Sequence, residues 1–186
     1  MKRFDARTVA ILSVMTALVT VFTLTVRVPM APTRGYINFA DVAIYFAAFT
    51  FGPWVGLLAG GIGTGLADAI GGYPQWTLFS FLIHGLQGFL AGWLSRRAFP
   101  SLSWILIGWA VGAVVMVAGY FLVGSILYGA GPAAVEAPGN FIQNLAGGFV
   151  GIPLFWAVRR AYPPITSMAG PHTWQEGKYP TPHQRG

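Results

Sequence analysis

Six long apolar runs, separated by short segments rich in turn residues, dominate this chain. They fall at about 8–28, 39–51, 54–70, 77–95, 102–126 and 139–158. Only 9% of the 186 residues are charged and 55% are hydrophobic, whereas about 25% of the residues of a water-soluble domain are charged. We therefore expect most of the surface to face lipid, and we interpret the runs as six transmembrane helices.

The runs favour an all-α membrane protein over the alternatives. A transmembrane β-barrel would need alternating segments of about ten residues, but these runs are apolar all round. The first run is longer than the apolar core of a signal peptide and no A-x-A cleavage site follows it, so we expect it to be retained. The second and third runs are short and separated only by Gly52 and Pro53, which favours a tight pair that tilts or re-enters.

The basic residues predict the orientation of the bundle. If six helices alternate, the clusters before the first run, after the fourth and after the sixth lie on one side, and the positive-inside rule makes that side the cytoplasm. Both termini are then cytoplasmic. The net charge of +6 is interpreted as this topology signal and not as a nucleic-acid surface. The clusters are Lys2, Arg3 and Arg7; Arg96 and Arg97; and Arg159 and Arg160.

We divide the chain into a six-helix transmembrane domain over residues 1–160 and a tail over 161–186. The tail is rich in Pro, Gly, Thr and His and has no hydrophobic period. Such a composition is typical of a disordered cytoplasmic segment.

Polar side chains within the runs gather in the predicted outer half. A charge at the bilayer centre costs about 2.5 to 3.5 kcal/mol on insertion scales, so each polar residue there needs a reason. The set predicts a binding cup open to the outside and closed beneath, whereas a conduction path would need polar lining throughout. Each amide could instead join two helices, which contributes about 0.6 kcal/mol on average. The candidate ligand contacts are Tyr36, Asn38, Trp76, Phe79, His84, Gln87, Tyr120, Asn140, Gln143 and Asn144.

Two acidic residues at the same depth have a structural interpretation. We expect Asp41 and Asp68 to cap helices or tie loops, pairing with Arg27 or Arg34.

A small-residue stripe on the first helix is made of Ala6, Ala10, Ser13 and Ala17. It has two open interpretations: docking of another helix, or packing inside this chain.

Little in the sequence supports catalysis, a metal or a cofactor. The chain has no cysteine, and it contains no Walker A, G-x-S-x-G or H-E-x-x-H sequence. The run GGIGTG breaks the G-x-G-x-x-G pattern and lies in an apolar helix. A membrane enzyme using Asp68 and His84 remains an alternative without a motif. We expect a protein that is not an enzyme, with no cofactor and no metal.

Four segments resemble a known family. GYINFAD (35–41), FGPWVGLLAGGIGTGLAD (51–68), GYPQW (72–76) and HGLQG (84–88) are similar in order and spacing to the substrate-binding S component of energy-coupling factor (ECF) vitamin transporters. The nearest branch is the riboflavin-type, which also includes hydroxymethylpyrimidine and pyridoxine carriers. This likeness runs from about residue 6 to 97. Relatives commonly have Lys and Glu where this chain has His84 and Gln87.

The resemblance implies a six-helix protein in the plasma membrane of a prokaryote. It would capture a vitamin or precursor outside and deliver it by toppling within a complex that holds a membrane coupling subunit and two ATPases. In the family the stripe of the first helix, here Ala6 to Ala17, meets the coupling subunit, and the loop 29–38 acts as a lid. No nucleic acid would be involved.

The ligand and the mode of transport have alternatives. Trp76, Phe79 and Tyr120 suit a flat heteroaromatic ring, and the amides of the sixth run suit its polar edge. We expect a neutral ring compound such as riboflavin, hydroxymethylpyrimidine or pyridoxine, because an anion would need a cation. The second hypothesis is a stand-alone facilitator or secondary carrier for a small heterocycle, against which the apolar inner half counts.

Overall fold

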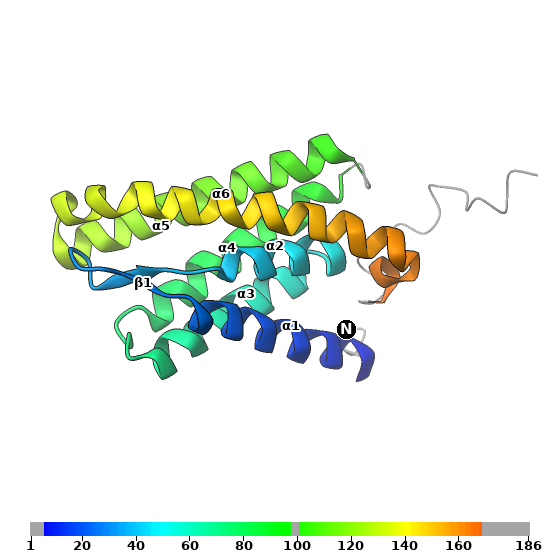
Figure 1. Cartoon of the computed structure of the whole chain (residues 1–186), viewed down its shortest axis with the longest axis horizontal. Helices are drawn as coiled ribbons and strands as arrows, with labels where there is room; N and C mark the ends of the chain where they lie inside the picture. Colours follow the sequence, from blue (N-terminus) through cyan, green and yellow to red (C-terminus); the bar gives the residue numbers. More distant parts are fainter. Residues whose placement is uncertain (1–5, 98–100, 169–186) are drawn as a thin grey trace, which may run out of the picture.

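The computed structural model describes residues 6–97 and 101–168, which form a bundle of six helices with a small hairpin at one end (Figure 1). This confirms the all-helical fold. Apart from the start of α6, the helices begin and end close to the predicted runs, and α4 coincides with its run. They are α1 (Ala6–Thr25), α2 (Ala40–Phe51), α3 (Pro53–Gly71), α4 (Thr77–Ser95), α5 (Leu102–Tyr128) and α6 (Ala130–Ala161).

Helix α2 lies inside the bundle. All 12 of its residues are buried, and in Figure 1 it lies between α1 and α6. At about 1.5 Å per residue it is roughly 18 Å long, which is too short for a hydrocarbon layer of about 30 Å. The other 5 helices are long and apolar enough to span. Gly52, at φ 96°, and Pro53 at the first position of α3 produce the break after α2.

The chain between α1 and α2 forms an antiparallel hairpin of β1 (Val28–Met30) and β2 (Gly35–Ile37). The segment predicted as a lid therefore has regular structure. In Figure 1 the hairpin extends from the start of α2 toward the left end of the bundle, which we call the hairpin end. Met30 and Ile37 face α6, where a Cβ on Gly139 would lie 2.7 Å from Ile37 Cδ1.

Glycines allow the helices to approach closely. A Cβ on Gly56 would lie 2.6 Å from the carbonyl oxygen of Gly88, and one on Gly60 would lie 2.8 Å from that of His84, so α3 and α4 are in backbone contact. A Cβ on Gly147 would overlap Asp41. These contacts bring α4 and α6 against the start of α2.

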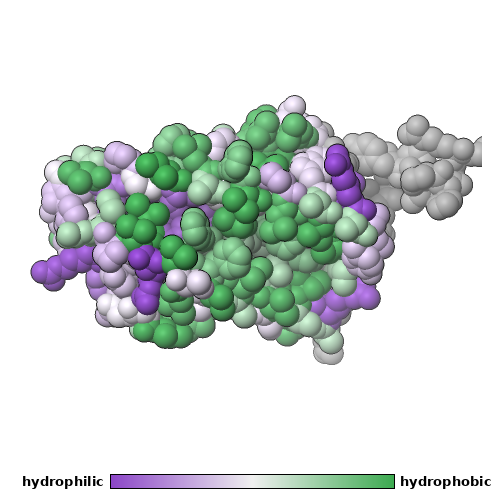
Figure 2. Space-filling model, viewed as in Figure 1, coloured by the Kyte–Doolittle hydropathy of each residue, from purple (hydrophilic) through white to green (hydrophobic). Residues whose placement is uncertain are grey.

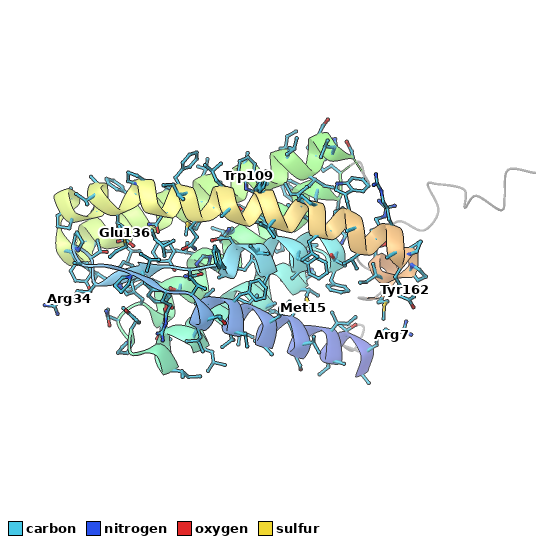
Figure 3. All side chains as sticks on the ribbon, viewed as in Figure 1. Arg7, Met15, Arg34, Trp109, Glu136 and Tyr162 are labelled. Carbon is cyan, nitrogen blue, oxygen red and sulfur yellow. The ribbon has the colours of Figure 1, made fainter. Side chains whose placement is uncertain are left out.

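The outer surface is apolar between two polar ends. In Figure 2 hydrophobic residues cover the middle of the visible face, and hydrophilic residues gather toward both ends. Figure 3 places Arg34 at the hairpin end and Arg7 at the other. Leu82, Val114 and Phe149 are among the large apolar side chains that point outward, as expected of a lipid-facing surface.

Two predicted boundaries are wrong. Helix α6 begins at Ala130 and not at 139, and Pro138 lies inside it; a proline within a membrane helix is tolerated where neighbours satisfy the freed backbone. The predicted disordered tail begins too early, because Pro163–Ser167 forms a 3-10 helix, η1, with Ile165 packed against the core. Residues 169–186 lie outside the described residues.

Candidate functional site

A small cavity lies between the hairpin and helices α1, α3, α4, α5 and α6. It encloses about 20 Å³, which is space for roughly one water molecule. Its lining combines hydroxyl, carboxyl, imidazole and aromatic groups. The lining residues are Thr23, Gly35, Tyr36, Asn38, Thr64, Asp68, Trp76, Ser80, His84, Tyr120 and Glu136.

A buried carboxylate organises the amides beside this cavity. Asp41, the second residue of α2, is 0% exposed. Its Oδ2 accepts a hydrogen bond from Gln143 Nε2 at 2.5 Å, and its Oδ1 accepts from Gln87 Nε2 and more weakly from Asn144 Nδ2 at 3.4 Å. Hydrogen bonds to a charged acceptor are the stronger class. Asp41 thus joins α2 to both α4 and α6.

The acceptor-only carboxylate fixes the direction of the bonds that lead away from it. Gln87 must present its NH₂ to Asp41, so its Oε1 faces His84 Nδ1, 2.7 Å away, and that nitrogen carries the proton. A neutral imidazole then keeps Nε2 as an acceptor. Gln143 likewise turns its Oε1 to the backbone N–H of Asn38 at 2.7 Å.

The hairpin is attached to α3 through a second buried carboxylate. The Tyr36 hydroxyl donates to Asp68 Oδ1 at 2.6 Å. Burial, and then the charge of Asp68, raise the pKa of Tyr36 well above its ordinary value, so this hydroxyl stays a donor at neutral pH. The guanidinium of Arg27 lies 5.8 Å from the centre of the Tyr36 ring. Tyr36 therefore links strand β2 to the wall of the cavity.

Aromatic rings form the other wall. Trp76, at the start of α4, is 2% exposed. Its ring centre lies 5.4 Å from that of Tyr120 and 6.5 Å from that of Phe79. The Tyr120 hydroxyl is 2.6 Å from Ser80 Oγ, and its ring is 5.5 Å from His84. These rings could stack on a flat ligand.

The ten residues predicted to contact a ligand fall into three groups. Tyr36, Asn38, Trp76, His84 and Tyr120 line the cavity. Gln87, Gln143 and Asn144 belong to the buried network around Asp41. Asn140 is buried one turn from Glu136 on α6, and Phe79 packs on Trp76 without lining the cavity.

The expected role of Asp41 is wrong and that of Asp68 is correct only in part. Asp41 does not pair with an arginine, because it points into the bundle between amides of α4 and α6. Asp68 ties the hairpin through Tyr36, whereas Arg27 donates to the carbonyl of Gly71 at 3.0 Å. Among the described residues the one acid–base pair within 4.0 Å is His84 with Asp41, at 3.9 Å.

Sequence reasoning missed six of the cavity residues, which are Thr23, Gly35, Thr64, Asp68, Ser80 and Glu136. Glu136 is 4% exposed, and its Oε1 lies 2.9 Å from where a Cβ on Gly35 would be. Figure 3 shows it beneath α6 beside the hairpin. A carboxylate in an otherwise uncharged segment, 128–158, was the available signal, but the predicted start of the helix at 139 left it in a loop. In the described part of the chain no three His, Cys, Asp or Glu side chains are grouped to hold a metal ion.

The fold and the cavity define a membrane-embedded binding protein: an apolar bundle with an enclosed polar and aromatic site near one end. A family model for the S component of ECF-type riboflavin transporters matches residues 3–160. The chain belongs to this family, whose members are transporter components and not enzymes. They are integral membrane proteins that bind small vitamin substrates and work with ECF membrane and ATPase subunits.

Individual relatives agree with this assignment. The chain is 42% identical over 147 residues to an uncharacterised protein of Pyrococcus woesei, covering 79% of this chain and 98% of the relative. It is 34% identical over 151 residues to the thiamine precursor transporter HmpT of Lactococcus lactis subsp. cremoris (strain MG1363), covering 79% and 86%. A solved structure of the S component of a bacterial ECF transporter shares the fold, with a TM-score of 0.68 at 21% identity, covering 83% of this chain and 96% of that one.

Proposed function

We propose that this chain captures a B-type vitamin or vitamin precursor in the cavity beneath the hairpin. It then delivers the compound inward together with an ECF coupling subunit and two ATPases. The observation that carries the proposal is the position of the cavity. Polar and aromatic side chains enclose it near the hairpin end, and the core below is built from apolar residues such as Ile44, Phe49 and Phe155. A polar site at one end above an apolar core suits capture of a ligand from one side and does not suit an open conduction path.

The ligand we propose is a thiamine precursor of the hydroxymethylpyrimidine type. The 34% identity to HmpT supports this choice over riboflavin. Cavity size also favours it, because the site must expand from about 20 Å³ and a single ring requires less expansion than the three fused rings of riboflavin. The ring would lie against Trp76 and Tyr120, with its polar atoms toward Asn38 and His84.

Entry of the ligand would require movement of the hairpin. Tyr36 and Gly35 belong to β2 and line the cavity, so the hairpin covers the site directly. Its two three-residue strands are stabilised mainly by contacts with the helices, since an isolated two-stranded hairpin is only marginally stable. We infer that the hairpin is the lid, opening at the hairpin end and closing over the ligand.

The coupling subunit would dock on α1. Ala6, Ala10, Ser13 and Ala17 are all exposed along this helix, while its buried residues, including Met15 and Val19, face the bundle. A stripe of small exposed residues permits close approach of another helix. This exposure favours the docking interpretation over packing inside the chain.

The orientation we propose places the hairpin end outside a prokaryotic plasma membrane. Arg96, Arg97, Arg159 and Arg160 lie at the ends of α4 and α6 away from the hairpin. The positive-inside rule would make that end cytoplasmic. Both termini would then be cytoplasmic.

The test is binding of defined compounds to the purified full chain. Calorimetry with hydroxymethylpyrimidine, pyridoxine and riboflavin should show tightest binding of the first, and uptake of it into vesicles should require an ECF module and ATP. Binding of none of the three would refute vitamin capture. Uptake by the chain alone would instead support the stand-alone carrier.

A further inference from the structure

The cavity is lined by hydrogen-bond acceptors that lack cationic partners. Asp41, Asp68 and Glu136 are the three acidic residues between positions 6 and 168, and their exposures are 0, 3 and 4%. Two of them, Asp68 and Glu136, line the cavity. In the described residues neither has a Lys, Arg or His nitrogen within 4.0 Å. Buried carboxylates are normally paired or hydrogen-bonded.

One carboxylate oxygen of Asp68 has no hydrogen-bond donor. Its Oδ1 is bonded to Tyr36, but its Oδ2 is buried without a hydrogen-bond partner in the described structure. Leaving a buried polar atom unpaired is costly, so an unpaired atom that lines a cavity marks a place where a ligand completes the bonding. On the aromatic wall the indole N–H of Trp76 is also buried and unpaired.

His84 contributes acceptor character to the same wall. When the ring carries a single proton, the bond to Gln87 fixes that proton on Nδ1, so the second ring nitrogen is then an acceptor. The ligand therefore meets acceptors on α3, α4 and α6 and a donor at Trp76.

From this arrangement of acceptors and one donor we infer that the site selects a heteroaromatic ligand by its exocyclic amino group, which donates an N–H to Asp68 Oδ2. This inference rests on the proposed function. A ring nitrogen beside the amino group could accept from the Trp76 indole, and Glu136 could accept from a second donor such as a hydroxymethyl group. A carbonyl oxygen in the place of the amino group would face the carboxylate and be repelled. The site would equally reject carboxylates and phosphates.

The inference makes a prediction about three pyrimidines bound to the purified full chain. They are hydroxymethylpyrimidine with its amino group, the des-amino compound, and the oxo compound in which a carbonyl replaces the amino group. A hydrogen bond to a charged group is worth at least a tenfold change in affinity. Calorimetry should show the amino compound binding at least tenfold tighter than the des-amino compound, and the oxo compound binding weakest.

Asp68→Asn should reverse part of this order. Its amide oxygen would keep the bond to Tyr36, and its NH₂ would take the place of Oδ2, which turns one acceptor into a donor. The oxo compound should therefore gain affinity and the amino compound should lose at least tenfold, while the des-amino compound changes little. Thr23→Val, a cavity-lining change that removes a hydroxyl bonded to the Val19 carbonyl within α1, should shift all three alike and serves as the control.

The outcomes separate the inference from the proposed function. If the parent chain binds the amino and oxo compounds equally, or if Asp68→Asn weakens all three alike, amino recognition by Asp68 is overturned and vitamin capture stands. If the parent binds none of the pyrimidines, pyridoxine or riboflavin, vitamin capture itself fails. Should Asp68→Asn not fold, the order of the three compounds on the parent chain decides the question.

Discussion

Gln143 tests whether the network around Asp41 supports the fold or contacts the ligand. Its Nε2 donates to the Asp41 carboxylate and its Oε1 accepts from the Asn38 backbone, but it does not line the cavity. Gln143→Met keeps most of the volume and removes both bonds. We expect a large loss of stability and a small change in affinity.

The magnitude follows from the two bonds. Loss of a hydrogen bond to a charged group costs about 1.5 to 3 kcal/mol, and an unpaired buried N–H costs about 1 to 3 kcal/mol. Allowing for relaxation and entry of water, we expect a loss of roughly 2 to 5 kcal/mol of unfolding free energy. For a chain of this size that lowers the melting temperature by roughly 5 to 15 °C.

The assay is thermal unfolding of the purified protein in detergent, combined with calorimetry on the ligand that binds the parent. Ile142→Met is the matched control, because Ile142 is the preceding residue of α6 and points outward with 62% of its surface exposed. Melting of Gln143→Met within about 2 °C of this control would refute the supporting role. A loss of affinity beyond tenfold without a change in melting would instead make Gln143 a ligand contact.

Four further tests probe the aromatic wall, the helix packing, the docking face and the lid. Trp76→Ala should weaken ligand binding at least tenfold by calorimetry, with a smaller effect on melting than Gln143→Met; unchanged affinity would place the site elsewhere. Gly147→Ala should destabilise the protein by about 1 to 3 kcal/mol, because its Cβ overlaps Asp41, whereas Gly131→Ala, with no atom within 4 Å of the added Cβ, should not; equal melting of the two would contradict the close α2–α6 contact. Ala10→Leu and Ala17→Leu should abolish ECF-dependent uptake and keep affinity within about threefold, while exposed Ala118→Leu on α5 should transport normally; transport by all three would remove α1 from docking. Amide hydrogen exchange over residues 28–37 should slow when ligand is added, and unchanged exchange would mean that the hairpin is not a lid.

Periodicity and turn residues were sufficient to predict the helices, because a lipid-facing helix must be apolar over its whole length. The break at Gly52–Pro53 and the bounds of α4 were predicted for this reason. The start of α6 was not, since residues 130–138 precede the apolar run from which the helix was predicted. The hairpin was not predicted either, because strands of three residues are too short to establish an alternating pattern.

The site could be predicted only in part. Hydrogen-bonding side chains at one depth identified five of the cavity residues, including Trp76 and Tyr120. Which amides face a ligand and which face Asp41 depends on the rotation of α4 and α6 about their axes, and hydropathy does not specify this. Glu136 reaches the cavity only because α6 continues for two turns beyond its apolar run. A single acidic residue in such an extension is therefore worth testing as a site residue in related chains.

The two buried carboxylates near the cavity have different consequences for binding. Asp41 is saturated by amides from α4 and α6, so the floor of the site is held by charge-assisted bonds on fixed helices. Asp68 keeps one free acceptor, Oδ2, and its Oδ1 accepts a hydrogen bond from Tyr36 of the hairpin. The hairpin would then lose conformational entropy when the ligand binds, whereas the network around Asp41 is already ordered before binding. A ligand that engages Asp68 Oδ2 would also stabilise the closed hairpin, because Tyr36 of the hairpin binds Oδ1 of the same carboxylate.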